Sequence, residues 1–149
     1  EQDLAYLQEV LLKAAALGQR LPGLQQPIVL PLHCRLRTGS SHPFLTEHLS
    51  PALNLNDVPA MLRPMSANEY RAAYPGGADV RYLTFQPPDI SPGRIRLVIS
   101  ALRGRPDGDP PPDEVGNLQA EFRLADGRWE AAGMPDLFIR NGSSPKQNE

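Results

Sequence analysis

The fold of this chain is decided by residues 117–132, which read NLQAEFRLADGRWEAA. The dipeptide Asp126-Gly127 predicts a two-residue hairpin, because a type I′ turn needs positive φ at both central positions. The turn would set Leu124 opposite Trp129 on an apolar face. That face also carries Leu118, Ala120, Phe122 and Ala131. We expect it to pack on the core with Trp129 buried, while Arg123 and Glu130 form a cross-strand charge pair on the other face.

Residues 3–17 carry apolar side chains at helical spacing and predict an amphipathic helix. Asp3 is the expected N-cap, and Gly18 or Pro22-Gly23 the expected end. The main apolar stripe consists of Leu4, Leu7, Leu11, Ala14 and Ala15, and Gln8 is expected to lie away from it. The apolar stripe of such a helix must be buried against another element of the fold.

Residues 27–37 (PIVLPLHCRLR) alternate strictly between the two faces of an extended chain, which predicts a half-buried strand. Residues 94–104, which begin RIRLVISALR, show the same pattern with Ile95, Leu97, Ile99 and Ala101 on one face. A third strand is expected over residues 80–86. Stretches rich in Pro, Ser, Asn or Asp are expected to be irregular, namely residues 38–57, 86–93 and 104–116.

Two short helices are expected between the first two strands. Asp57 can cap a turn that runs to Arg63, where Pro64 ends it. Ser66 and Glu69 have the spacing of a capping box, in which each side chain bonds the backbone N–H of the other residue. The helix that they start is expected to end near Tyr74.

This order of elements predicts an α+β fold in one domain over residues 1–140, with a polar, disordered tail over 141–149. The N-terminal helix would pack on one antiparallel sheet. Its strands are expected over residues 27–37, 80–86, 94–104, 117–125 and 128–140. A chain of 149 residues is long enough to form such a core without a disulfide or a structural metal.

His33, Cys34, His42 and His48 fall within sixteen residues and are all potential zinc ligands. Zinc sites favour close pairs, and only the two later histidines have such a spacing. Cys34 alternates with leucines, so a core role is the simpler interpretation, and as a nucleophile it lacks a well-placed base. We expect no metal, no cofactor and no catalytic residue.

The acidic loop over residues 104–116 supplies carboxylates that calcium could use. Its order of acids matches no EF-hand loop, where ligands fall at fixed alternate positions. A solvated loop is the simpler interpretation, and calcium binding stays an open alternative.

Residues 35–105 carry nine arginines against five acids. Arg94 and Arg96 on one predicted strand, with Arg35 and Arg37 on another, would form a basic strip on the outer side of the sheet. Nucleic-acid binding calls for interleaved stacking aromatics, which this side lacks. An acidic protein partner is therefore the expected ligand of Arg35, Arg37, Arg94 and Arg96, and a plain solvated face is the alternative.

A helix that leads into an antiparallel meander resembles the soluble part of a type IV minor pilin or a type II secretion pseudopilin. Residues 4–17 match the lower half of that family's long helix. The segment YLTFQPPDISPGRIRLVIS, residues 82–100, resembles its strand, Phe-x-Pro, turn and strand. The family's methylated hydrophobic segment has no counterpart here. The resemblance covers about half the chain and implies an assembly subunit of the cell envelope, periplasmic or at the cell surface, tethered through a segment missing from this chain.

The same order, with DGRW at residues 126–129 entering a late strand, also resembles cystatin-like and NTF2-like domains. These include small-ligand binders and enzymes, which form the alternative function. Such a domain would hold polar groups among the residues of its inner face. The predicted inner faces carry no Asp, His or Tyr, so a non-enzymatic protein-binding domain is the function expected from the sequence.

Overall fold

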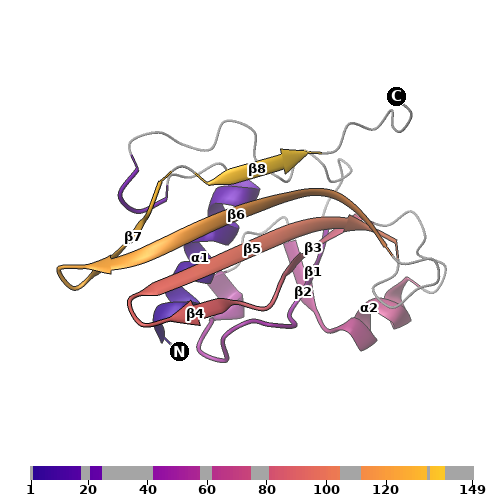
Figure 1. The fold of residues 1–149 in the computed structure, drawn as a ribbon. Helices are drawn as coiled ribbons and strands as arrows, with labels where there is room; N and C mark the ends of the chain where they lie inside the picture. The colour runs from indigo at the N-terminus through magenta and orange to yellow at the C-terminus, as the bar shows by residue number, and fades with distance from the viewer. Residues whose placement is uncertain are drawn as a thin grey trace, which may run out of the picture.

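The computed structural model describes residues 2–17, 21–24, 42–57, 62–74, 81–104, 112–133 and 135–139. Within them the fold is α+β: a mixed sheet of eight strands with two α-helices (Figure 1). The helices are α1 (Gln2–Leu17) and α2 (Ala67–Ala73). The strands are β1 (His42–Leu45), β2 (Leu62–Met65), β3 (Arg81–Phe85), β4 (Asp89–Ser91), β5 (Arg94–Arg103), β6 (Asp113–Ala125), β7 (Arg128–Ala131) and β8 (Asp136–Ile139).

The predicted hairpin is confirmed as β6 and β7. Leu124 pairs with Trp129 and Arg123 with Glu130, as the turn chemistry requires. The predicted charge pair of Arg123 with Glu130 was wrong, because Arg123 Nε bonds Glu121 Oε2 instead. Asp126 has φ 53° and Gly127 φ 76°, the positive values that a type I′ turn needs.

The main core lies between α1 and one face of the sheet, here called the inner face. In Figure 1, α1 crosses behind β5 and β6. Leu7 and Leu11 of α1 are fully buried. So are the inner-face residues Leu97, Ile99, Leu118 and Phe122. The predicted apolar alternation of β5 is therefore confirmed, and so is the helix over residues 3–17.

Gln8 differs from its prediction, because it is fully buried. Its Nε2 donates to the carbonyl oxygen of His48 at 2.9 Å, and its Oε1 accepts from the backbone N–H of Ser50 at 2.8 Å. Both ends of the amide thus bond a segment about forty residues away, and the periodicity of the helix alone could not reveal this. His48 takes a left-handed φ of 67° in that segment. Asp3, the expected N-cap, lies in the first turn of α1 instead.

Trp129 is only half-buried, so the prediction of a buried Trp129 was wrong. Leu124, which faces it, is 46% exposed. The reason is geometric: the tip of the hairpin extends beyond α1 in Figure 1, so the helix cannot cover it. The indole Nε1 of Trp129 is buried and has no hydrogen-bond partner among the described residues.

The sheet is mixed, so the prediction of one antiparallel sheet was wrong. The strand order is β2-β1-β3-β5-β6-β7, with β4 pairing β5 and β8 pairing β6. β1 runs parallel to both β2 and β3. The chain passes from β2 through α2 to β3 and so crosses over β1, which is how parallel strands are joined. The predicted strand over residues 27–37 and the tail over 141–149 lie outside the described residues.

Several short strands occur where irregular chain was expected. β1 falls within residues 38–57, β4 within 86–93, and the start of β6 within 104–116. Leu62 and Arg63, predicted to be helical, begin β2, and the expected strand over residues 128–140 is divided into β7 and β8. Each of these segments is too short or too rich in proline to show a clear alternation of apolar and polar residues. Pairing with neighbouring strands therefore decides its conformation.

The α2 helix is confirmed with its capping box, because Ser66 Oγ accepts from the N–H of Glu69 and Glu69 Oε1 accepts from the N–H of Ser66. This helix covers a second, smaller core that the sequence did not predict. Tyr70 packs edge-on against Tyr82, with 5.1 Å between ring centroids. The Tyr70 hydroxyl donates to the carbonyl oxygen of Gly104 at 2.8 Å. Within the described ranges, a helix therefore covers the second side of the sheet at one end only.

Replacement of Phe122 and of Trp129 by alanine should have unequal effects, although both belong to the same hairpin. Phe122 is fully buried, so Phe122→Ala should cost about 3–5 kcal/mol of unfolding free energy. Trp129→Ala should cost about 1–2 kcal/mol, because the indole is half-exposed and has an unsatisfied N–H. Urea unfolding of both variants measures the difference. Equal losses would show that the tip of the hairpin is covered.

Gln8→Leu should destabilise the protein by about 1–3 kcal/mol, since it leaves the buried N–H of Ser50 without an acceptor. Glu9→Gln, one residue further along α1, breaks only a partly exposed ion pair with Lys13 and should cost less than about 0.5 kcal/mol. Thermal and urea unfolding of the two variants test this. A Gln8→Leu protein as stable as the wild type would contradict the bond between α1 and the segment over residues 48–50.

Candidate partner-binding face

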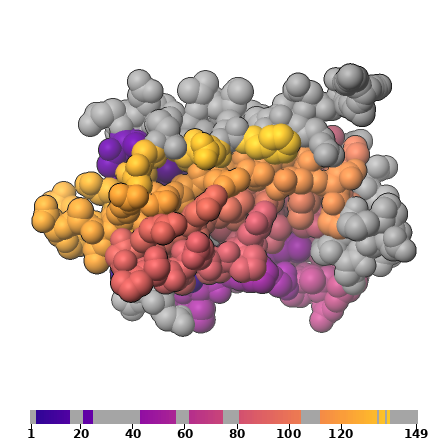
Figure 2. All heavy atoms as spheres, viewed as in Figure 1, coloured from indigo at the N-terminus to yellow at the C-terminus, as the bar shows by residue number. Residues whose placement is uncertain are grey.

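The side of β5 and β6 that faces away from α1, here called the outer face, is seen from the front in Figure 2. The strand register fixes which side chains point to it. From β5 and β6 these are Arg94, Arg96, Val98, Ser100, Asn117, Gln119, Glu121 and Arg123. β4 adds Asp89 beside Arg96, and β8 adds Asp136 beside Gln119. The open part of the outer face is therefore polar and of mixed charge.

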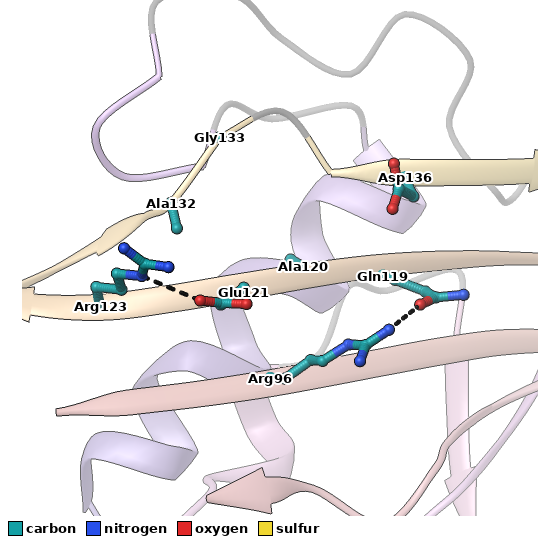
Figure 3. A pocket seen from close by; sticks show the side chains of 8 residues that line it. All are labelled: Arg96, Gln119, Ala120, Glu121, Arg123, Ala132, Gly133 and Asp136. Atoms are coloured by element: carbon teal, nitrogen blue, oxygen red, sulfur yellow. Dashed lines mark hydrogen bonds and ion pairs between the residues drawn. The ribbon is translucent and has the colours of Figure 1, made fainter. Parts of the chain in front are cut away.

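Glu121 holds two arginines together on this face. Its Oε2 lies 3.0 Å from Arg123 Nε and 3.3 Å from Arg94 Nε, and Figure 3 shows the first of these contacts. Arg94 and Arg123 are register partners on adjacent strands, a placement that repels when both charges are alike. The shared carboxylate offsets that repulsion.

Arg96 is bonded differently from its neighbours. Its Nη2 donates to Gln119 Oε1 at 2.9 Å, so the side chain turns toward β6 (Figure 3). Among the described residues, no carboxylate oxygen lies within 4.0 Å of its guanidinium nitrogens. Arg96 is exposed and carries a charge with a neutral partner only.

A chain of hydrogen bonds crosses the same face nearer to α2. Gln86 Nε2 donates to Ser100 Oγ at 2.9 Å, and Ser100 Oγ donates to Glu114 Oε2 at 3.1 Å. Ser100 is only 2% exposed, so its hydroxyl is fixed between these two side chains. Glu114 is thereby held at the surface by a neutral donor.

Three shallow grooves run across the outer face in sequence. The first, here called the bulge groove, has a volume of about 240 Å³ and is lined by Arg96, Gln119, Ala120, Glu121, Arg123, Ala132, Gly133 and Asp136 (Figure 3). The central groove, of about 420 Å³, shares Arg96 and Gln119 with it and has Val98 in its lining. The apolar groove, of about 420 Å³, shares Gln86 and Pro87 with the central groove and reaches α2. Its lining includes Leu45, Tyr82 and Leu102.

The predicted arginines are only partly placed by the structure. Arg94 and Arg96 lie two residues apart on the outer face, whereas Arg35 and Arg37 lie outside the described residues. The described part of the face is not a purely basic strip, because acids from four strands lie between the arginines. These acids are Asp89, Glu121, Glu130 and Asp136.

Gln119, Glu121 and Asp136 were not among the predicted site residues. The signal for the first two was present, since Asn117, Gln119, Glu121 and Arg123 alternate with apolar residues along β6. What the sequence could not supply was the register between β5 and β6, which brings Glu121 beside Arg94 and Arg96. Asp136 depends further on the pairing of β8 with β6.

The residues weighed as metal ligands are not brought together within the described chain. No three His, Cys, Asp or Glu side chains cluster there as a metal ion would require. His48 is exposed, His33 and Cys34 lie outside the described residues, and Asp113 pairs with Arg103 at 3.1 Å.

The chain matches no protein-family model. No curated protein and no solved structure matches it at a significant level either. Neither helix in the described ranges is long and apolar enough to cross a membrane.

Glu121→Gln should weaken the fold slightly and in a salt-dependent way. It removes the charge that Arg94 and Arg123 share, so unfolding free energy should fall by about 0.5–1 kcal/mol at low ionic strength. High salt screens the arginines and should reduce the loss. Glu130→Gln on the same face is the control, because within the described chain Glu130 forms no ion pair. Equal, salt-independent effects of the two changes would contradict the role of Glu121.

Proposed function

We propose that this protein is a non-enzymatic protein-binding domain, the soluble part of a membrane-tethered cell-envelope assembly subunit with pilin- or pseudopilin-like architecture. Its tether would be a segment outside these 149 residues, and its place the periplasm or the cell surface. The observation that carries the binding role is the outer face, where Arg94 and Arg96 are exposed and Arg96 lines two of the grooves.

The inner side supports binding over catalysis. α1 and the sheet bury apolar side chains against each other, and Gln8 is the one fully buried polar side chain of the described part of α1. Both ends of its amide are taken up by backbone groups of His48 and Ser50. An enzyme or small-ligand binder needs a concave pocket with convergent polar groups, and this amide is already satisfied. The alternative of an NTF2-like or cystatin-like ligand binder is therefore less well supported.

Arginine on the outer face supports a protein partner over nucleic acid. Arginine is enriched among residues that dominate binding energy at protein interfaces. Single-stranded nucleic acid would need aromatic side chains on which bases stack, and the outer-face positions of β5 and β6 carry none. The interleaved acids of this face would also repel a phosphate backbone.

Double charge reversal tests the proposal. Arg94→Glu with Arg96→Glu should leave the fold intact, because both side chains are exposed, and should abolish recovery of the native partner in a pull-down from the source organism. Wild-type and variant proteins are compared at matched salt, and circular dichroism checks the fold.

The matched control is Arg63→Glu with Arg103→Glu. It changes the net charge equally, but Arg63 lies on the far edge strand β2 and Arg103 at the opposite end of β5. The control should recover the partner as the wild type does. If the outer-face variant recovers the same partners as the wild type, the proposal fails and the small-ligand function takes its place.

A further inference from the structure

Resting on the proposed function, we infer which kind of partner the outer face takes: an extended peptide segment that lies along β5. It would carry one acidic side chain over Arg96 and a bulky apolar side chain in the apolar groove, about six residues away. This assigns a ligand class to the grooves and not only to the arginines.

The three grooves are joined in a way that suits an extended chain. Arg96 lines both the bulge groove and the central groove, and Pro87 lines both the central and the apolar groove. Along β5 the outward residues between the two ends are the half-buried Val98 and the buried Ser100. Side chains of β6 border this path on one side, and Gln86 and Pro87 border it on the other. A segment of a partner can therefore follow β5 from end to end.

The spacing of the two contacts follows from the strand. Arg96 and Leu102 are six residues apart on β5, which at about 3.3 Å per residue is about 20 Å. An extended peptide alongside β5 advances by the same length per residue. The acidic residue over Arg96 and the apolar residue in the apolar groove, here called its two anchors, are therefore also about six residues apart. Six is an even number, and in an extended chain residues an even number apart point to the same side. Both anchors can then face the sheet together.

Charge complementarity defines the anchor at Arg96. This guanidinium donates to Gln119 and has no carboxylate within 4.0 Å in the described chain, whereas Arg94 and Arg123 share Glu121. A carboxylate of the partner would give Arg96 a charged acceptor, which strengthens a hydrogen bond about twofold. Asp89 and Asp136 flank the same position and would repel further acids. A single acidic residue fits, and an acidic run does not.

Apolar contact defines the anchor at the other end. Leu45, Tyr82 and Leu102 line the apolar groove, and Pro87 borders it. Leu102 and Thr84 are half-exposed, so the groove is open above β3 and β5. Glu47 and Arg71 also line it, but both already have partners in α2: Glu47, from the turn after β1, accepts from the N–H of Ala67, and Arg71 donates to Asn68. The remaining free surface of the groove favours an aliphatic or aromatic side chain.

Panning of a random nine-residue peptide library against the intact chain tests the inference. We expect the enriched peptides to share one acidic residue and, six positions away, a bulky apolar residue. Synthetic peptides with this pattern should bind the wild type, and Arg96→Glu and Thr84→Lys should each weaken binding by about tenfold or more, as one lost anchor requires. Fluorescence anisotropy measures the affinities.

Two variants of matched chemistry serve as controls. Arg63→Glu repeats the charge reversal on β2, and Thr46→Lys repeats the threonine change outside the lining of the three grooves; both should bind like the wild type. Enrichment of peptides without the pattern, no enrichment, or equal binding to Arg96→Glu would each overturn the inference. If the native partner still depends on Arg94 and Arg96 in the pull-down, the proposed function stands, and the partner uses a folded surface instead of an extended segment.

Discussion

Coverage of the sheet by helices is the constraint on which the rest of this structure depends. A sheet has two sides, and each side that carries apolar residues must be covered. The described chain has one long helix, α1, which buries the inner face of β5 and β6, and one short helix, α2, which covers the other side at β1, β2 and β3. The open part of the outer face of β5 and β6 carries polar and charged residues, while Ser100 and Asn117 on the same face are buried.

The charges on the outer face follow from that exposure. Arginines on adjacent strands would repel one another unless acids stood between them, and Glu121 does so for Arg94 and Arg123. Arg96 is satisfied by the amide of Gln119 and keeps an unpaired charge. Among the described residues, Glu130 and Asp136 on the same face form no ion pair either, so this face carries unpaired charges of both signs.

For some elements, the chemistry of a few neighbouring residues was sufficient to predict the conformation. The Asp126-Gly127 turn, the capping box of Ser66 and the alternation in β5 each predict a conformation from a few neighbouring residues, and the structure agrees. The short strands β1 and β4 carry no such pattern, because pairing with distant strands decides their conformation. The burial of Gln8 could not be predicted from local sequence either, because it is explained by a loop about forty residues away.

For the site, the sequence predicted which arginines share a face of β5 but not what surrounds them. Alternation within one strand gives the direction of each side chain, and Arg94 and Arg96 point as expected. The carboxylates beside them come from β4, β6 and β8, and only the register between strands places them. A basic strip inferred from one residue type therefore becomes a face of mixed charge in the structure.

The mixed sheet also bears on the order in which the chain folds. β5, β6 and β7 are consecutive hairpin partners, so little chain entropy is lost when they pair. The parallel pairing of Phe44 with Leu83 joins residues 39 positions apart, and the amide of Gln8 reaches across a similar distance. Contacts of such long range form slowly. We expect the meander to nucleate folding, and the β1–β2 half of the sheet to be the last to assemble and the first to open.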